Sequence, residues 1–218
     1  MGGDFKGVGQ FSADGRLYQI EYAQQASNQG SIVCLAKFED TIEIFYESRA
    51  INKLFIPAKK IYKITDNIYI LFSGVQSDSY GVLHDAIYEA VSHKYNTTED
   101  ITILETAKII AKLMRNKSTT VSFRPYGLRS VVFGIEGGKP LIYVIEADGN
   151  YVEYKKCAVG NKNENCIEKL LENDNHFNAL DALLCVIQKD VSKIKGFRLN
   201  SDGLSEIPNN EIESHLNE

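Results

Sequence analysis

The residue types best suited to metal binding or nucleophilic chemistry in this chain are its cysteines and histidines. They are Cys34, Cys157, Cys166, Cys185, His84, His93, His176 and His215. The cysteines show no CxxC spacing, and three of them sit in apolar surroundings, where a reduced thiol behaves as a small hydrophobic side chain. The histidines are far apart in the sequence, which favours ordinary surface or helix positions. We therefore expect no metal site, no structural disulfide and no cofactor.

The composition describes a chain that can bury one substantial core. It has 218 residues, of which 44% are hydrophobic, and we expect a single domain over residues 1–218. The net charge is −5 and Lys and Arg are scattered, so no basic stripe predicts nucleic-acid binding. No apolar run is long enough to cross a bilayer, and the first thirty residues lack a signal-peptide core. We expect a soluble, intracellular protein with no membrane partner.

Short and almost unbroken apolar runs predict strands that are covered on both faces. They occupy residues 32–36, 68–72, 131–135 and 141–145. Turn signals lie close to these runs, at Glu39-Asp40, Asp66-Asn67, Gly137-Gly138 and Asp148-Gly149. Such close spacing predicts antiparallel hairpins.

Apolar residues at helical spacing predict four helices, over residues 76–95, 102–117, 163–172 and 178–192. A final strand is expected near residues 196–199, and a short terminal helix at 209–217. The order of strands, helix pair, strands, helix pair and strand predicts an α+β fold. We expect a four-layer αββα sandwich, with two antiparallel sheets lying between helix pairs.

One extra helix is predicted ahead of the first strand, over residues 17–29. The turn pair Asp14-Gly15 precedes it and Gly30 is a plausible stop. Its narrow apolar face recurs at every third position, at Leu17, Ile20, Ala23 and Ala26. The two alanines leave room for another backbone to approach closely, so we expect a neighbouring subunit to receive this face.

The same stretch carries a dense motif. It reads FSADGRLYQIEYAQQASNQGS, and its motif residues are Phe11, Ser12, Gly15, Arg16, Leu17, Gln19, Glu21, Tyr22, Ala23, Gly30 and Ser31. On these residues the chain resembles the alpha subunits of the 20S proteasome, whose signature reads approximately F-S-P-x-G-R-L-x-Q-x-E-Y-A, followed by a helix and G-S. So many motif residues in one window make this signal specific. GRLYQIEYA, NQGS and the ending EIESHL most resemble the alpha-one ring position, alpha type six in mammalian naming.

The resemblance implies a fold like that of amino-terminal-nucleophile (Ntn) hydrolases and a non-catalytic, structural role. Such subunits form the heptameric outer ring, which gates the access of substrates, supports beta-ring assembly and docks regulatory particles in ubiquitin-dependent degradation. Threonine-type peptidase activity then resides in the beta subunits. The implied partners are neighbouring alpha subunits, beta subunits and regulatory-particle ATPases or other activators, in the cytoplasm and nucleus. The implied ring-packing and gate residues are Phe11, Gly15, Arg16, Leu17, Tyr22, Ala23 and Ala26.

An alternative function rests on Gly30-Ser31. In Ntn hydrolases, cleavage exposes a Thr, Ser or Cys at the start of the first strand, and its own amine serves as the base. Ser31 occupies the equivalent place, so an active hydrolase processed at Gly30-Ser31 is the competing hypothesis. We favour the structural role, because cleavage would detach the preceding helix. In addition, Ser31 lacks a following run of threonines, and Glu47-Ser48-Arg49 replaces a D-S-R segment.

Lys60, in Ala58-Lys59-Lys60-Ile61, falls where alpha subunits place the lysine of a docking pocket between subunits. In the family this lysine pairs with the terminal carboxylate of an activator tail, and Gly74 and Val75 resemble the pocket wall. A charge-assisted hydrogen bond of this kind contributes about 1.5–3 kcal/mol. The alternative is a solvated lysine at a strand edge.

Two further segments compare differently with the family. Arg124-Pro125-Tyr126-Gly127 resembles the R-P-F/Y-G loop of alpha subunits, and its Pro and Gly suit a structural loop. The amino terminus departs from the pattern, since MGGDFKGVGQ lacks the usual Tyr/Phe-Asp-Arg and Ala13 replaces a proline. We expect residues 1–10 to form a flexible gate tail, with remodelled gate contacts or a small contribution to gating.

Overall fold

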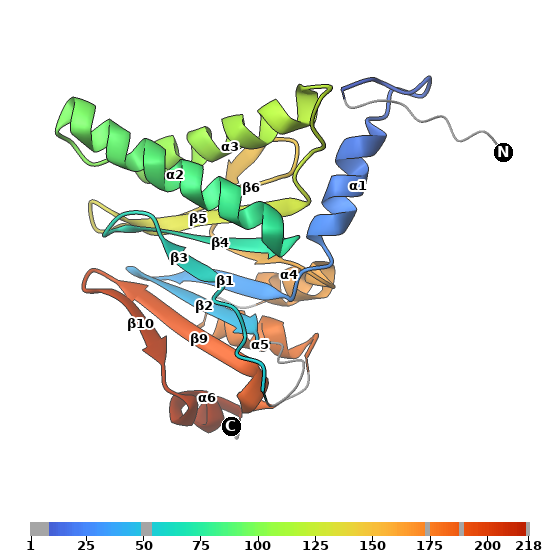
Figure 1. Cartoon of the computed structure of the whole chain (residues 1–218). Coiled ribbons are helices and arrows are strands. Elements are labelled where there is room, and N and C mark those ends of the chain that lie inside the picture. Colours follow the sequence, from blue (N-terminus) through green and yellow to red (C-terminus); the bar gives the residue numbers. More distant parts are fainter. Residues whose placement is uncertain (1–8, 49–53, 173–174, 188–189, 217–218) are drawn as a thin grey trace.

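Two five-stranded antiparallel sheets face each other in the computed structural model, which describes residues 9–48, 54–172, 175–187 and 190–216 (Figure 1). The first sheet contains β1 (Val33–Phe38), β2 (Thr41–Glu47), β8 (Lys156–Val159), β9 (Ile194–Asn200) and β10 (Gly203–Ile207), in the order β10-β9-β2-β1-β8. The second contains β3 (Ile61–Lys63), β4 (Ile68–Gly74), β5 (Leu128–Glu136), β6 (Lys139–Ile145) and β7 (Tyr151–Glu153), in that order. The hairpins expected from the four apolar runs are confirmed. The tail expected at residues 1–10 lies outside the described residues except for positions 9 and 10.

Helices cover the outer face of each sheet (Figure 1). The second sheet carries α2 (Gln76–Thr97) and α3 (Ile103–Thr119), and the first carries α4 (Asn163–Glu172) and α5 (Asn178–Leu184). The extra helix α1 (Tyr18–Ser27) stands at one end of the sandwich, and α6 (Asn209–Leu216) closes the far side of the first sheet. This arrangement confirms the predicted αββα sandwich with an additional N-terminal helix.

Three apolar layers hold these elements together, one between the sheets and one between each sheet and its helices. Strand β2 shows how one sequence supplies two layers, because successive side chains of a strand point to opposite faces. Ile44 packs between the sheets and Phe45 packs toward α5, and both side chains are fully buried. Coverage on both faces is the reason why the strand sequences are apolar runs and do not alternate.

Helix α3 begins with local chemistry that the sequence encodes. Thr102 and Glu105 form a capping box, in which the Thr102 hydroxyl accepts from the Glu105 N–H at 3.1 Å and Glu105 accepts from the Thr102 N–H at 3.1 Å. Glu136, the last residue of β5, accepts a hydrogen bond from the Ile103 N–H at 3.0 Å. The start of the helix is therefore tied to the sheet that it covers.

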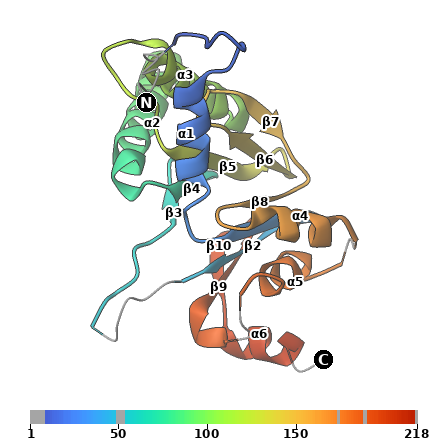
Figure 2. The same cartoon turned by 90° about the vertical axis from the view of Figure 1, so that its right-hand side faces the viewer.

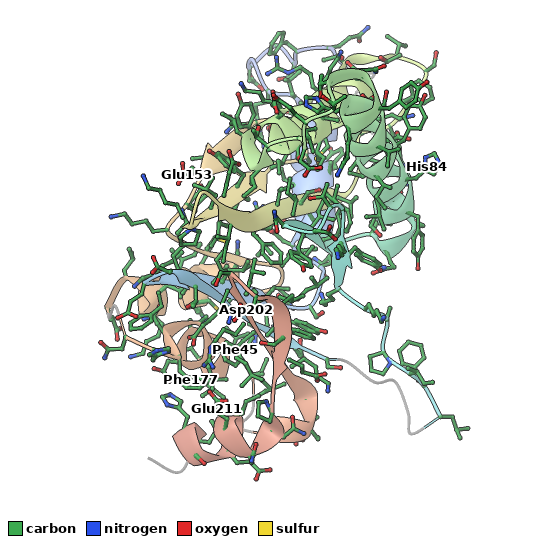
Figure 3. The ribbon with its side chains drawn as sticks, turned by 90° about the vertical axis from the view of Figure 1, so that its left-hand side faces the viewer. Phe45, His84, Glu153, Phe177, Asp202 and Glu211 are labelled. Carbon is green, nitrogen blue, oxygen red and sulfur yellow. The ribbon has the colours of Figure 1, made fainter. Side chains whose placement is uncertain are left out.

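Charged and aromatic side chains anchor the C-terminal helix α6 to the first sheet. Arg198 donates to Glu211 of α6 at 3.0 Å and to the buried carboxylate of Glu43 at 3.1 Å. The rings of Phe177 and Phe45 lie 5.8 Å apart beside this network. Figure 3 shows Phe45, Phe177 and Glu211 gathered on this side of the first sheet.

The helix expected over residues 178–192 is wrong beyond Leu184. After Leu184 the chain forms a hydrogen bond of the 3₁₀ type, in which the Val186 N–H donates to the Leu183 carbonyl, three residues back, at 3.1 Å. The Asp190 side chain then accepts from the Ser192 N–H at 3.1 Å and starts a separate 3₁₀ turn, Val191–Lys193. This local side-chain bond competes with continued helix. Residues 188–189 of the expected helix, and residue 217 of the expected terminal helix, lie outside the described residues.

Within the described ranges, no helix is long and apolar enough to span a membrane. The same residues bring together no group of three or more His, Cys, Asp or Glu side chains that could hold a metal ion. All four cysteines are free thiols; Cys185 is exposed and the other three are buried.

Candidate functional site

The motif residues at the amino end form a closed turn that leads into α1. The Ser12 hydroxyl accepts from the Arg16 N–H at 2.9 Å, the Ser12 N–H donates to the Arg16 carbonyl at 2.8 Å, and Gly15 adopts a φ of 74°. The Arg16 guanidinium then holds the Glu21 carboxylate through two hydrogen bonds, of which the bond from Nε measures 2.9 Å. The turn and this ion pair account for Ser12, Gly15, Arg16 and Glu21 of the motif. Tyr22 is left on the surface, 61% exposed.

The small side chains of α1 face the body of the chain itself. Ala23 is 7% exposed, and a Cβ placed on Gly127 would lie 3.1 Å from the Cβ of Ala26. At the next residue, a Cβ on Gly74 would lie 2.9 Å from the Ser27 Cα. The close backbone approach that the alanines indicated is therefore real, but the approaching backbone belongs to this chain. The ring-packing role predicted for Ala23 and Ala26 stays a prediction.

An ion pair between the exposed Arg124 side chain and a buried carboxylate holds the Arg124–Gly127 loop against the start of α2. Two hydrogen bonds of 2.6 Å join the Arg124 guanidinium to both carboxylate oxygens of Asp78, whose side chain is 7% exposed. Asp78 also accepts from the Gly127 N–H at 3.1 Å, and the Gly127 carbonyl accepts from the Val75 N–H at 3.0 Å. The structural role predicted for the Pro-Gly loop fits this geometry.

Sequence reasoning missed Asp78. Only its place in the first turn of α2, four residues after Gly74, could have signalled a role there. Burial tends to raise the pKa of Asp78, but the hydrogen bonds from Arg124 and Gly127 outweigh it, so the pKa lies below its usual value.

A pocket of about 280 Å³ opens where β1, β2 and β3 meet the end of β4. Phe55, Pro57 and Phe72 supply apolar surface, and Lys60 supplies a cation. The Lys60 ammonium donates to the carbonyl oxygen of Ser31 at 3.1 Å, which places it beside the segment that leads into β1. The pocket therefore combines the Lys60 ammonium with apolar surface, and the acidic residue Glu47 also belongs to its lining.

The three residues predicted for a docking pocket are brought close together. Lys60 and Gly74 both line the pocket. Val75 lies next to them but is not part of the described lining; its side chain is 36% exposed, and a Cβ on Gly127 would lie 2.9 Å from its Cγ2. Val75 thus contacts the loop that closes over α1.

The Gly30-Ser31 segment fits tightly between the two sheets. A Cβ on Gly30 would lie 2.4 Å from the Ser73 hydroxyl oxygen and 2.5 Å from the Gly74 nitrogen, so only glycine fits without displacement. The Gly30 carbonyl accepts from the Asn161 N–H at 2.9 Å. While Ser31 is joined to Gly30, its nitrogen is an amide and cannot act as a base.

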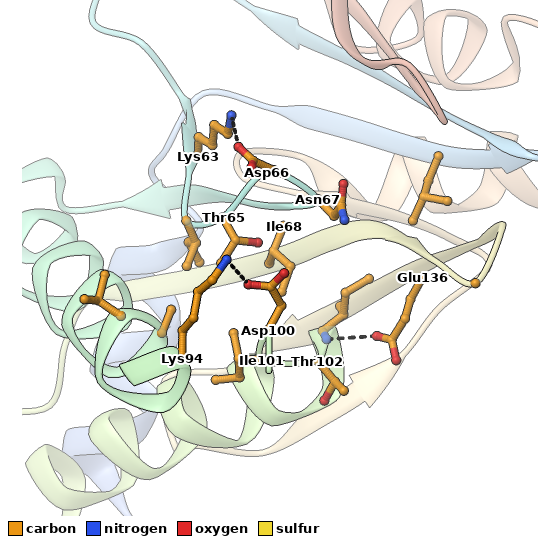
Figure 4. Close-up of a pocket in the computed structure, with 16 residues that line it drawn as sticks. Lys63, Thr65, Asp66, Asn67, Ile68, Lys94, Asp100, Ile101, Thr102 and Glu136 are labelled. Atoms are coloured by element: carbon orange, nitrogen blue, oxygen red, sulfur yellow. Dashed lines mark hydrogen bonds and ion pairs between the residues drawn. The ribbon is translucent and has the colours of Figure 1, made fainter. Parts of the chain in front are cut away.

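A larger hollow of about 580 Å³ lies at the end of the sandwich away from α1 (Figure 4). Its charged lining is already paired: Lys63 contacts Asp66 and Lys94 contacts Asp100, each at 2.7 Å. This hollow shares no lining residue with the pocket beside Lys60.

Two facing antiparallel sheets between helical layers define the Ntn-hydrolase-like class of sandwich folds. A family model described as proteasome subunit matches residues 27–199, and a second model, for the N-terminal signature of A-type proteasome subunits, matches residues 6–26. The chain belongs to the proteasome subunit family and carries its alpha-type signature.

Similar curated proteins agree with this assignment. A probable alpha type-5 proteasome subunit of Encephalitozoon cuniculi is 27% identical, over 92% of this chain and 90% of that protein. The alpha-type proteasome subunit of Natronomonas pharaonis is 27% identical over 98% of this chain and 89% of its own. The alpha-type proteasome subunit of Methanosphaerula palustris is 30% identical over 75% and 68%. The alpha-one ring position stays a prediction.

Proposed function

We propose that this chain is a non-catalytic alpha subunit of the 20S core, at one position of a heptameric outer ring. In this role it gates the access of substrates, supports assembly of the beta ring and docks regulatory particles, in ubiquitin-dependent degradation in the cytoplasm and nucleus. Peptide hydrolysis is assigned to the partner beta subunits. The whole chain, residues 1–218, acts as one domain in this proposal.

One observation carries the non-catalytic assignment, the packing of residues 26–30 into the body of the chain. Ala26 contacts Gly127, Ser27 contacts Gly74 and Gly30 contacts Ser73, all at distances that leave no room for a side chain on the glycine. The Ser73 hydroxyl also donates to the Ser27 carbonyl at 3.1 Å. Cleavage before Ser31 would break the chain at the end of this packed segment and leave α1 without a covalent link.

Intact-mass analysis of the purified particle tests this assignment directly. We expect a chain that retains α1 and shows no turnover after the beta subunits are inhibited. A mature chain that begins at Ser31, with its own hydrolytic activity, would contradict the proposal. That result is the competing hypothesis, and the Lys60 ammonium 3.1 Å from the Ser31 carbonyl oxygen is the observation that favours it.

Ring formation needs two different surfaces on each protomer, because contacts between successive members of a ring are heterologous. One candidate surface is the outer side of the α1 region, where Phe11 is 69% and Tyr22 is 61% exposed. The other is the stretch before β3, where Leu54 is 94% and Ile56 is 89% exposed. Figure 2 shows this stretch extending away from both sheets. We propose that these apolar surfaces pair between adjacent subunits.

Activator docking is assigned to the Lys60 pocket. Lysine in an apolar recess suits a terminal carboxylate, because a charge-assisted hydrogen bond gains strength where water is excluded. The apolar side chains of Phe55 and Phe72 suit the residues that precede the carboxylate. The proposed ligand is thus the carboxyl end of a partner protein.

A further inference from the structure

Tyr46 lines the same pocket and has a hydroxyl group whose role is not explained by the fold. Tyr46 is 8% exposed, and its ring stacks on the ring of Phe197, with the centroids 6.0 Å apart and an angle of 6° between the planes. Among the described residues no hydrogen bond to this hydroxyl is found, whereas the neighbouring Tyr62 hydroxyl accepts from Gln76 at 3.2 Å. The hydroxyl oxygen is not among the fully buried side-chain atoms that lack a partner, so it keeps contact with solvent and is accessible to a ligand in the pocket that Tyr46 lines.

The electrostatics keep this hydroxyl in its donor form. Burial, with smaller contributions from the charges of Glu206 and Tyr62, raises the pKa of Tyr46 to about 12. At neutral pH the group is therefore a phenol with one O–H to donate. The Glu206 carboxylate, which could have used it, is paired with Lys195 at 2.6 Å.

We propose that Tyr46 is a second anchoring residue of the Lys60 pocket, which donates a hydrogen bond to the carboxylate of a docked chain terminus. This inference rests on the docking proposed above and deepens it. A carboxylate has two oxygens, so it can accept from the ammonium of Lys60 and from the phenol of Tyr46 together. The stacked ring fixes the position of the hydroxyl, so little rotational freedom is lost on binding.

The pocket then recognises a free carboxylate through two donors of different kinds. The charge of Lys60 attracts a carboxylate whatever its orientation, whereas the hydroxyl of Tyr46 can donate a hydrogen bond only to a carboxylate in one orientation. The pocket should therefore bind a peptide with a free carboxyl terminus more tightly than the same peptide with an amidated terminus. Tyr46 should contribute part of this difference in affinity.

Fluorescence anisotropy on the 218-residue chain tests this inference. The probe is a labelled peptide that ends in Gly-Leu-Phe-Ala with a free carboxylate, compared with the same peptide as a terminal amide. Tyr46→Phe removes only the hydroxyl, and we expect it to weaken binding of the acid peptide about tenfold, as for a hydrogen bond to a charged group. Binding of the amide peptide should change much less, so the acid-to-amide affinity ratio falls. That ratio is read within one variant and is insensitive to a general loss of stability.

Tyr69→Phe is the matched control. Tyr69 is equally buried between the sheets, at 7% exposed, and its ring stacks on Phe133, but it does not line the pocket. We expect Tyr69→Phe to leave both affinities unchanged. Unchanged acid binding in Tyr46→Phe, with binding still lost in Lys60→Ala, would overturn the role of Tyr46 and leave docking at Lys60 standing. A wild-type chain that does not distinguish the acid from the amide would overturn both.

Discussion

Arg124 donates two hydrogen bonds of 2.6 Å to the Asp78 carboxylate, which also accepts one from the Gly127 N–H at 3.1 Å. Through Gly127 this pair fixes the loop that packs on Ala26 of α1 and on Val75 beside the Lys60 pocket. One ion pair therefore links the helix that precedes the first strand with the proposed docking site.

Loss of this pair should destabilise the fold. In Arg124→Ala the Asp78 carboxylate stays buried with only the Gly127 N–H to satisfy it, and we expect a loss of about 1–2 kcal/mol in the free energy of unfolding. That figure is reduced for the solvent exposure of the Arg124 side chain, 63%. Urea unfolding midpoints measure it. Arg16→Ala, which breaks the exposed pair with Glu21, is the control and should cost clearly less; equal losses would contradict the structural role of Asp78.

Asp78 should also make stability depend on acid pH. Its pKa is lowered in the folded chain, so between that value and the ordinary value near 3.9 the unfolded chain binds more protons and stability rises with pH. The contribution is complete above about pH 5 and is lost as the pH falls through the folded pKa. We expect Asp78→Asn to show a shallower stability change than wild type below pH 5. Identical pH profiles would argue against this prediction.

Gly74→Ala should be strongly destabilising. Gly74 has a φ of 119°, and a Cβ there would lie 2.1 Å from the Gly127 carbonyl oxygen. Backbone strain and the displaced loop together should cost more than about 2 kcal/mol. Gly81→Ala is the matched control: Gly81 lies inside α2, and its nearest neighbour would be the Tyr126 hydroxyl at 3.6 Å. That change should stabilise the chain by about 0.5–1 kcal/mol, and thermal unfolding distinguishes the two signs.

Lys60→Ala should weaken activator binding about tenfold or more, because the carboxylate of the docked tail loses a charge-assisted hydrogen bond. Hydrolysis of small peptides by an open core should not change. Lys59→Ala is the control, because Lys59 is exposed and lies outside the pocket lining. If activator affinity measured by native gel shift were the same in both variants, Lys60 would be an ordinary surface lysine.

The exposed apolar stretch before β3 should be needed for ring assembly. Replacing Leu54 and Ile56 by Ser removes surface that is 94% and 89% exposed, so the isolated chain should keep its stability. We expect incorporation into rings on native gels to fall several-fold. Leu171→Ser, at an 81% exposed position on α4, provides the comparison. Normal incorporation of the double variant would rule out this contact surface.

The sequence by itself determined the family, the order of elements and the layers that they build. Strands covered on both faces appear as unbroken apolar runs, as in β4 from Ile68, and helix starts carry their own capping residues, as at Thr102. These signals are local, so they can be read from neighbours in the chain. The same holds for the turn from Ser12 to Arg16, whose hydrogen bonds span only a few residues.

Only the tertiary structure decided which residues meet across the sequence. Ala26 and Gly127 are distant in the chain. The small side chain of Ala26 indicated that another backbone approaches closely, but the sequence did not show that Gly127 of the same chain is that backbone. Neither Asp78 nor Tyr46 belongs to a recognisable sequence motif. Asp78 has its role because the fold brings Arg124 to it, and Tyr46 because the fold places it in the same pocket as Lys60. Packing between layers depends on distances that no local pattern encodes, and for this reason the pocket had to be found in three dimensions.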